Sequence, residues 1–420
     1  MTSRRSLGPG FHRLWGASAL SNLADGAFVV ALPLLAAQLT RSPGLVAGVA
    51  LAERLPWLLF ALVAGALADR LDRRRTMVNV QLLRVAVIGG LAAAVALDLA
   101  SLPMVYAAAI VLGVGETLFD TAAQSAITAV VARDDLSRAN GRLYAAEATA
   151  NQFLGPALGG ALAGVAAIGL VLAFGASALC FGLAAALLAL LRGAFKPERP
   201  DAPARLHAEI AEGLRYLAGH RVLRTLAIMT GVQNLANTAW FSIFVLYAVG
   251  PGSALELSRG AYGLLFTFMG AGGVLGSLIA PRLERWLGRS NVLALAIVAG
   301  ATAAATPAVT SLVPLIAAAF VLSSVGVVIW NVVAVSLRQR ITPDRLLGRV
   351  NAGYRLLAWG SMPLGAALGG AVAELLGLRA VFALSGAIVC SMLLLRPLVS
   401  DRALHAAERA SEVAAVPGPA

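Results

Sequence analysis

Charged residues are scarce in this 420-residue sequence: Asp, Glu, Lys and Arg together make up 13% of it, and Lys196 is its only lysine. Soluble globular proteins carry about 25% charged residues. Hydrophobic residues make up 59% here, and the mean hydropathy is +0.82. One or two soluble cores cannot enclose so much apolar surface. The composition therefore excludes an ordinary soluble enzyme and indicates a protein of the lipid bilayer.

Residues that bind metals or carry redox chemistry are also few, with two cysteines and four histidines. Cys180 and Cys390 each stand alone in an apolar run, outside any zinc or redox motif. The histidines lie in terminal or loop regions, so the predicted spans contain no histidine–carboxylate cluster. No phosphate-binding loop of the G-x-x-x-x-G-K-[ST] type occurs. We therefore predict no metal, no cofactor, no catalytic residue and no direct use of ATP.

Twelve apolar stretches are long enough to cross a bilayer as helices, which takes about 20 residues each. They are rich in Ala and Leu and run on without alternation, which argues against barrel strands. The first is interrupted by Asn22 and Asp25 and is too long for a signal peptide, so we expect it to be retained. The predicted spans are 14–38, 45–68, 77–99, 103–131, 141–165, 168–191, 225–249, 259–281, 290–311, 313–336, 350–375 and 378–398.

A polar stretch divides the spans into two sets of six. It opens with the turn-rich run from Lys196 to Asp201 and continues with Leu206, Ile210, Leu214 and Leu217 at helical spacing. This pattern predicts an amphipathic helix at the cytoplasmic face, which is compatible with a simple connector. The predicted regions are an N-terminal half over 1–192, a linker over 193–224, a C-terminal half over 225–398 and a cytoplasmic tail over 399–420.

The basic residues predict the direction of the spans. The net charge is +12, but the arginines form short clusters between apolar runs, not one solvated basic face, which argues against nucleic-acid binding. With both termini inside, the inner segments hold 27 of the 33 basic residues and the outer loops hold three. Positive residues concentrate in cytoplasmic loops. We therefore predict a multi-pass protein of the plasma (inner) membrane with both termini in the cytoplasm.

The two halves repeat one another at an offset of 210–211 residues. Gly155-Pro-Ala-Leu-Gly159-Gly160 matches Gly365-Ala-Ala-Leu-Gly369-Gly370, and Gly65 matches Gly276. Asp120 corresponds to Asn331. Two six-helix halves with the same orientation are parallel repeats, which pack about an axis normal to the membrane. The sequence thus predicts an all-α membrane protein of twelve transmembrane helices in two parallel repeats.

The loop between the second and third spans carries a family motif. Gly65-Ala-Leu-Ala-Asp69-Arg70-Leu-Asp72-Arg73-Arg74 resembles the G-x-L-x-D-R-x-G-R-R motif of the major facilitator superfamily, with Asp72 in place of the late glycine. Three features resemble the enterobactin-exporter-like and macrolide-efflux-like branch of that superfamily. They are this variant of the loop motif, the run N-L-A-D-G in the first span and the run R-A-N-G-R-L before the fifth span. The resemblance implies that Gly65, Asp69, Arg70, Arg73 and Arg74 gate the transporter by latching its halves. For Arg75, positive-inside topology is the preferred explanation.

Span 5 resembles the end of an antiporter motif, although the earlier glycines of that motif are absent. Its candidate residues are Gly155, Pro156, Gly159 and Gly160. Glycine and proline also thin and kink helices so that neighbouring backbones pack closely. Both an antiporter role and simple helix packing remain open.

Charges at bilayer depth are the strongest functional signal, because each costs about 2.5–3.5 kcal/mol at a helix centre. Asp25 is the leading candidate for proton coupling, with Arg54 as its expected ion-pair partner; a permanent structural bridge is the alternative. Glu53 lies beside Arg54, and Glu116 and Asp120 lie one turn apart in span 4 as the second candidate pair. Arg84 in span 3 and Glu147 near the start of span 5 complete the set. The second half offers no acid at this depth.

Polar and aromatic residues within the spans are candidates for the substrate cavity: Asn22, Trp57, Gln233, Asn234, Asn237, Trp240, Asn331 and Arg355. Trp330 is a further aromatic candidate. The predicted function is secondary active transport, as proton-coupled efflux of a hydrophobic small molecule such as a drug or siderophore. We expect protons, the substrate and the lipid bilayer as partners and a monomeric protein. A proton-coupled uptake symporter remains open, and a receptor or a membrane-embedded enzyme is the alternative class.

Overall fold

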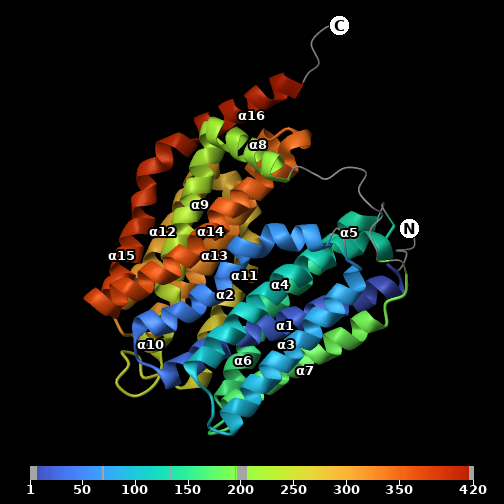
Figure 1. Ribbon diagram of the computed structural model, residues 1–420. Helices are drawn as coiled ribbons and strands as arrows, with labels where there is room; N and C mark the ends of the chain where they lie inside the picture. Colours follow the sequence, from blue (N-terminus) through green and yellow to red (C-terminus); the bar gives the residue numbers. More distant parts are fainter. Residues whose placement is uncertain (1–6, 69–70, 133–134, 194, 196–205, 416–420) are drawn as a thin grey trace. The chain divides into compact units, whose positions relative to one another are not determined.

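The computed structural model describes residues 7–68, 71–132, 135–193, 195 and 206–415, which fold almost entirely as helices (Figure 1). By clustering of contacts, the chain divides into two compact units. Unit 1 comprises residues 1–201 and 245–267, and unit 2 comprises residues 202–244 and 268–420. The division into an N-terminal half over 1–192 and a C-terminal half over 225–398 stays a prediction.

Unit 1 is built around its first helix, which contacts α4, α5, α6 and α7. A buried core of Phe11, Leu14, Phe119 and Phe181 lies around that helix. Most of the short helix α10 and the start of α11 belong to this unit as well. The helices of the N-terminal part are α1 (Gly8–Leu39), α2 (Pro43–Ala68), α3 (Arg73–Ala96), α4 (Leu102–Val130), α5 (Leu136–Thr149), the π-helical turn η2 (Ala150–Leu154), α6 (Gly155–Ala163) and α7 (Gly169–Ala189).

Unit 2 packs α9 against α14 and α12 against α13 and α15. Its core includes Trp330, Leu337, Tyr354 and Leu404. The helices of the C-terminal part are α8 (Leu206–Gly219), α9 (Arg221–Phe241), α10 (Phe244–Ala248), α11 (Arg259–Leu287), α12 (Arg289–Val309), α13 (Val313–Ile341), α14 (Asp344–Leu376), α15 (Leu378–Ser391), the 3₁₀ helix η3 (Met392–Val399) and α16 (Asp401–Ala415).

Within the described residues, ten helices are long and apolar enough to cross a membrane. The two predicted spans outside this group are interrupted or polar. Span 141–165 is divided into α5, η2 and α6, where Pro156 cannot donate a backbone hydrogen bond. Span 225–249 is divided into α9 and α10 and carries Gln233, Asn234 and Asn237. The helices follow the twelve spans expected from the sequence, and the protein is an all-α, multi-pass membrane protein.

The linker and the tail are more ordered than the composition alone indicates. Helix α8 forms where the amphipathic pattern predicts it and packs against α14, while Tyr216 donates a hydrogen bond of 3.2 Å to the carbonyl oxygen of Ile341 at the end of α13. Glu212 also bonds Arg349 of α14. In the tail, predicted only as a cytoplasmic extension, α16 buries Leu404 in the core of unit 2. Both segments are therefore integral parts of unit 2.

Candidate functional site: a buried charge cluster in unit 1

Unit 1 gathers acidic and basic side chains from three neighbouring helices around a small cavity of about 40 Å³. Helix α1 contributes Asp25, α2 contributes Glu53 and Arg54, and α4 contributes Glu116. The cavity is completed by Phe28, Val29, Leu112, Gly113 and Asn151. The structure thus brings together four of the five residues predicted to couple protons, although they come from distant positions along the chain.

Helices α2 and α4 approach closely at this level because Gly113 has no side chain. A Cβ atom placed on Gly113 would lie 2.3 Å from the carbonyl oxygen of Glu53 and 3.0 Å from the ring of Pro56. Pro56 lies inside α2 and cannot donate a backbone hydrogen bond, so it disturbs the helix next to Glu53 and Arg54. The local sequence therefore brings the charged pair on α2 beside the acid on α4.

Asp25 pairs with Arg84 of α3, and the predicted pairing with Arg54 is wrong. The Oδ2 atom of Asp25 lies 3.3 Å from an Nη atom of Arg84. Arg54 instead lies 3.8 Å from Glu53, its neighbour in the chain, with 39% of its side chain exposed. Equal depth in the bilayer suggested the first pairing, but the rotation of α2 and α3 about their axes decides which arginine faces Asp25.

Arg84 is the principal residue that the sequence analysis left without a role. Its side chain is fully buried and is held by the Ser21 hydroxyl at 3.1 Å, while its guanidinium lies 5.0 Å from the centre of the Phe181 ring. Gln81, one turn earlier on α3, donates to the same hydroxyl at 2.9 Å. An arginine this enclosed needs a counter-charge, and Asp25 supplies it. Its position at helical spacing from another polar residue, Gln81, was the available sequence signal.

Glu116 and Asp120 are the acids with the fewest bonds. Glu116 accepts one long hydrogen bond, 3.5 Å, from the indole nitrogen of Trp57. Asp120, one turn further along α4 and half-buried, forms no hydrogen bond or ion pair with any residue for which the structure gives a side chain. Trp57, predicted to contact substrate, thus lies beside the charge cluster. The two acids of α4 differ from Asp25 and Glu53, each of which has an arginine partner.

The glycine motif of span 5 packs α6 against α1. A Cβ atom on Gly155 would lie 2.7 Å from the Cα atom of Gly26, and one on Gly159 would lie 2.4 Å from the carbonyl oxygen of Ala27. Gly160 makes an equally close approach to Gly263 of α11 within unit 1. Just before the motif, Asn151 lies within 3.4 Å of Asn22, which donates to the carbonyl oxygen of Ser18 at 2.9 Å. These contacts give the glycines a packing role; an additional antiporter role stays a prediction.

The predicted gating loop is described only in part. Asp69 and Arg70 lie outside the described residues, and only the backbone of Gly65 is described, at the end of α2. Arg73 and Arg74 bond the carbonyl oxygens of Ser125 and Ala189, which joins the start of α3 to α4 and α7 within unit 1. Asp72, which replaces the motif's late glycine, caps α3 by accepting the backbone N–H of Arg75 at 2.9 Å. A gating role for Gly65, Asp69, Arg70, Arg73 and Arg74 stays a prediction.

Trp240, predicted to line the substrate cavity, lies in the aromatic core of unit 2, and its contact with substrate stays a prediction. Trp240 is 3% exposed and packs among aromatic rings of the same unit, with the centre of the Phe320 ring 5.1 Å away. An indole with large apolar area is stabilised by such packing. Trp330 is also buried and donates to the Thr230 hydroxyl at 3.0 Å.

The other unit 2 candidates do not form a charge cluster comparable to that of unit 1. Asn234 donates to the carbonyl oxygen of Ala358 at 2.6 Å, and Gln233 lies against Gly300. Arg355 is exposed and stacks 4.1 Å from the ring of Trp359. Asn237 and Asn331 are exposed on α9 and α13. Their contact with substrate stays a prediction.

A second buried arginine, Arg338, lies near the C-terminal end of α13. Its Nε donates to Asn351 at 2.6 Å, and its guanidinium lies 4.0 Å from the centre of the Tyr354 ring. Only 9% of the residue is exposed. The predicted span 313–336 leaves Arg338 outside the helix, whereas α13 continues to Ile341. Unit 2 thus holds its buried arginine with an amide and an aromatic ring.

Comparison with known proteins agrees with this architecture. The transmembrane secretion effector family matches residues 8–419, which is nearly the whole chain. The chain belongs to this family of major facilitator transporters. Its relatives include the multidrug efflux pump Tap of Mycobacterium tuberculosis, which is 32% identical over 96% of both chains. The multidrug efflux pump Tap of Mycolicibacterium fortuitum is 30% identical over 87% of this chain and 90% of its own.

Solved structures show the same fold at low identity. The nucleoside transporter NupG has a TM-score of 0.72 at 11% identity, and the match covers 93% of this chain and 99% of its own. A bacterial homolog of the human lysosomal transporter Spinster has a TM-score of 0.69 at 15% identity, with both chains fully covered. The family and its relatives make this major facilitator protein a membrane transporter of small molecules and not an enzyme.

Proposed function

We propose that this major facilitator protein exports lipophilic drugs across the inner membrane in exchange for protons. It acts as a monomer with both termini in the cytoplasm. Export is supported by the full-length similarity to proteins named multidrug efflux pumps. Proton exchange is supported by one observation above all: the two acids of α4, Glu116 and Asp120, lie within an apolar span and form no ion pair of 4 Å or less with any described arginine.

Asp25 and Glu53 are less suited to carry protons. Each already has a guanidinium within 4 Å, so protonating either carboxylate means giving up an ion pair. Protonating Asp25 would also leave Arg84 fully buried without its counter-charge, a change that is strongly unfavourable. We therefore assign the Asp25–Arg84 pair to holding α1 against α3 and move the proton-coupling role to α4.

Glu116 and Asp120 meet the requirements for proton exchange. Adjacent carboxylates tend to share one proton. Glu116 borders the cavity of about 40 Å³, which has room for a few water molecules but none for a drug. Water in this cavity would give a proton a path to Glu116. Drug binding requires the surrounding helices to move, as they do when a transporter alternates between its two open states.

Everted membrane vesicles from cells that express the protein test the function. Their outer face is the former cytoplasmic face, so an exporter moves ethidium into the lumen when the lumen is made acidic. We expect ethidium accumulation that a protonophore abolishes. Accumulation that persists with the protonophore would contradict proton exchange, and drug movement only out of everted vesicles would instead indicate uptake symport. Glu256→Gln, in an exposed turn of unit 1, is the matched control and should transport normally.

A further inference from the structure

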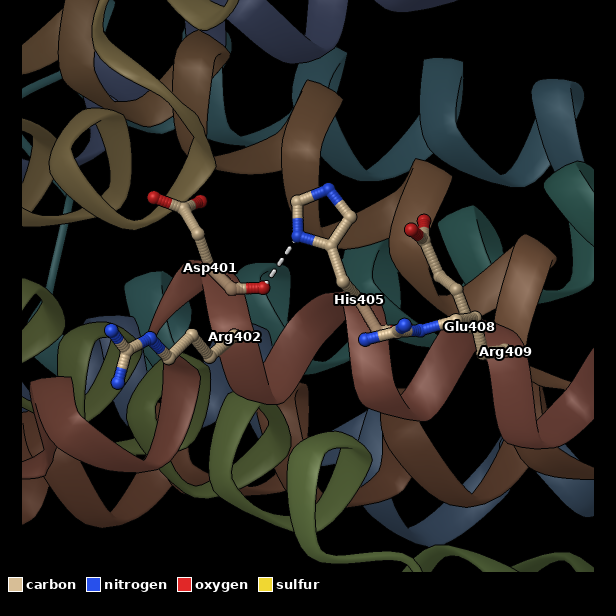
Figure 2. A pocket seen from close by; sticks show the side chains of 5 residues that line it. All are labelled: Asp401, Arg402, His405, Glu408 and Arg409. Carbon is tan, nitrogen blue, oxygen red and sulfur yellow. Dashed lines mark hydrogen bonds between the residues drawn. The ribbon is translucent and has the colours of Figure 1, made fainter.

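The C-terminal helix α16 carries a charged hollow that the transport mechanism does not use. The hollow has a volume of about 550 Å³ and is lined by Asp401, Arg402, His405, Glu408 and Arg409 (Figure 2). The helix itself is docked, because Leu404 and Ala407 on its other face are buried in the core of unit 2. The side chains around the hollow are therefore displayed from a fixed helix.

Both acids of the hollow are already bonded to unit 2. Asp401 accepts the backbone N–H of Ser290 at 3.0 Å, at the start of α12. Glu408 accepts from Arg289 at 2.6 Å and lies 3.6 Å from Arg340. Glu408 is thus paired with two arginines of unit 2, and Asp401 is bonded to the start of α12. The pairing of Glu408 reduces the repulsion that an anionic ligand in the hollow would meet.

The two arginines of the hollow retain most of their hydrogen-bonding groups. Arg402 is exposed and forms no hydrogen bond or ion pair with any described side chain or backbone group. Arg409 is also exposed and uses only its Nε, in a 3.4 Å hydrogen bond to the carbonyl oxygen of His405. The His405 ring lies between them along the helix, with Nδ1 2.6 Å from the carbonyl oxygen of Asp401. The hollow thus presents two guanidinium groups with free N–H donors.

Helix α16 begins just after the last candidate span. The candidate span Leu378–Val399 ends two residues before α16, so the backbone of Arg402 lies within about 11 Å of the end of the span. That span faces lipid on one side, where Leu384, Ile388 and Leu394 are exposed. Within unit 2, α16 contacts α13 and α9 and turns away from the direction of α15 (Figure 1). Seven residues of helix place Arg409 only about 10 Å beyond Arg402.

We propose that the hollow on α16 binds the phosphate headgroups of anionic lipids in the cytoplasmic leaflet. Guanidinium groups form paired, charge-assisted hydrogen bonds to phosphate oxygens, and Arg402 and Arg409 have the free donors to do so. Arginines next to the cytoplasmic end of a span are also attracted by the negative surface of this leaflet. The inference rests on the proposed cytoplasmic C-terminus but not on the drug or on proton exchange.

Native mass spectrometry of the full-length protein, titrated in detergent with phosphatidylglycerol or phosphatidylcholine, tests this site. We expect wild-type protein to retain phosphatidylglycerol preferentially and Arg402→Ala/Arg409→Ala to lower that preference at least about fivefold. The control Arg215→Ala/Arg221→Ala removes the same charge from exposed positions on α8 and α9 and should keep the preference. The variant Arg402→Lys/Arg409→Lys keeps the charge, and its preference for phosphatidylglycerol should lie between those of the wild type and of Arg402→Ala/Arg409→Ala.

Two outcomes would overturn the proposal. An equal loss in the Arg215/Arg221 control would show a general effect of charge instead of a site on α16. Displacement of phosphatidylglycerol by millimolar inorganic phosphate would show a site for the free anion and not for lipid. Circular dichroism of each variant confirms that a loss of lipid is not a loss of helix.

Discussion

The two units share one packing scheme but differ in charge at the same positions. In unit 1, a Cβ atom on Gly159 of α6 would lie 2.4 Å from the carbonyl oxygen of Ala27 on α1. In unit 2, one on Gly369 of α14 would lie 2.2 Å from the carbonyl oxygen of Ala239 on α9. These matched contacts make Ala239 the counterpart of Ala27. Two residues earlier, Asp25 therefore corresponds to Asn237.

The other charges of unit 1 are also neutral in unit 2. Asp120 corresponds to Asn331 through the sequence repeat. Gly115 of α4 faces Arg84, whereas its repeat counterpart Gly326 faces Ala296 and Ala299. The same helical packing thus forms with and without the ionised groups. The comparison teaches that this packing does not require the acids of α4, which supports a role for Glu116 and Asp120 in transport.

The largest effect on stability is expected from removing the carboxylate partner of Arg84. Asp25→Asn gives α1 the amide that unit 2 has, but it leaves a fully buried guanidinium unpaired. Removing one partner of a buried pair costs about 3–5 kcal/mol. Thermal unfolding in detergent should show a large loss of stability, and adding Arg84→Leu should recover most of it. A double variant less stable than Asp25→Asn would contradict the assigned pairing.

A smaller loss of stability should follow from filling the glycine contacts, and it should be similar in both units. Gly159→Ala and Gly369→Ala each place a methyl group against a backbone carbonyl of the neighbouring helix, which overpacking studies value at about 1–3 kcal/mol. Gly175→Ala on α7 meets no atom within 4 Å and is the control. Thermal unfolding in detergent measures the loss of stability in each variant. Loss in only one unit would show that the two contacts are not equivalent.

Exchanging the acid and its amide counterpart should affect transport in unit 1 alone. Asp120→Asn should lower proton-driven drug transport at least about tenfold, a change of about 1.4 kcal/mol, with little change in unfolding temperature. Asn331→Asp in that background should not restore transport, because no acid equivalent to Glu116 lies one turn away on α13. Restoration in everted vesicles would show that either unit can supply the acid.

The smallest effect is expected at Trp57. Its indole N–H donates one long hydrogen bond to Glu116, and Trp57→Phe removes that bond while keeping most of the ring. A bond of this kind contributes about 0.5 kcal/mol or slightly more, so transport should fall about two- to threefold. Trp240→Phe should leave the pH dependence of transport unchanged, because Trp240 packs among uncharged aromatic rings of unit 2. Initial rates of drug transport, measured at several external pH values, distinguish Trp57→Phe from Trp240→Phe.

Most of the fold could be predicted from the sequence, because apolar length and basic loops reflect the bilayer directly. The positions of the helices, the linker helix and the repeat followed from local composition. The pairing of Asp25 could not be predicted, since Arg54 and Arg84 lie at similar depth and only helix rotation separates them. The packing of Trp240 and the docking of α16 likewise depend on contacts between distant segments.

The central claim, that Glu116 and Asp120 carry the protons, is tested most directly by comparing two modes of transport in one variant. Purified Glu116→Gln/Asp120→Asn protein in liposomes should still exchange drug for drug without a gradient, because the drug path and the Asp25–Arg84 pair remain. The same liposomes should fail to accumulate drug when a pH gradient is imposed. Gradient-driven accumulation at the wild-type rate would contradict the account.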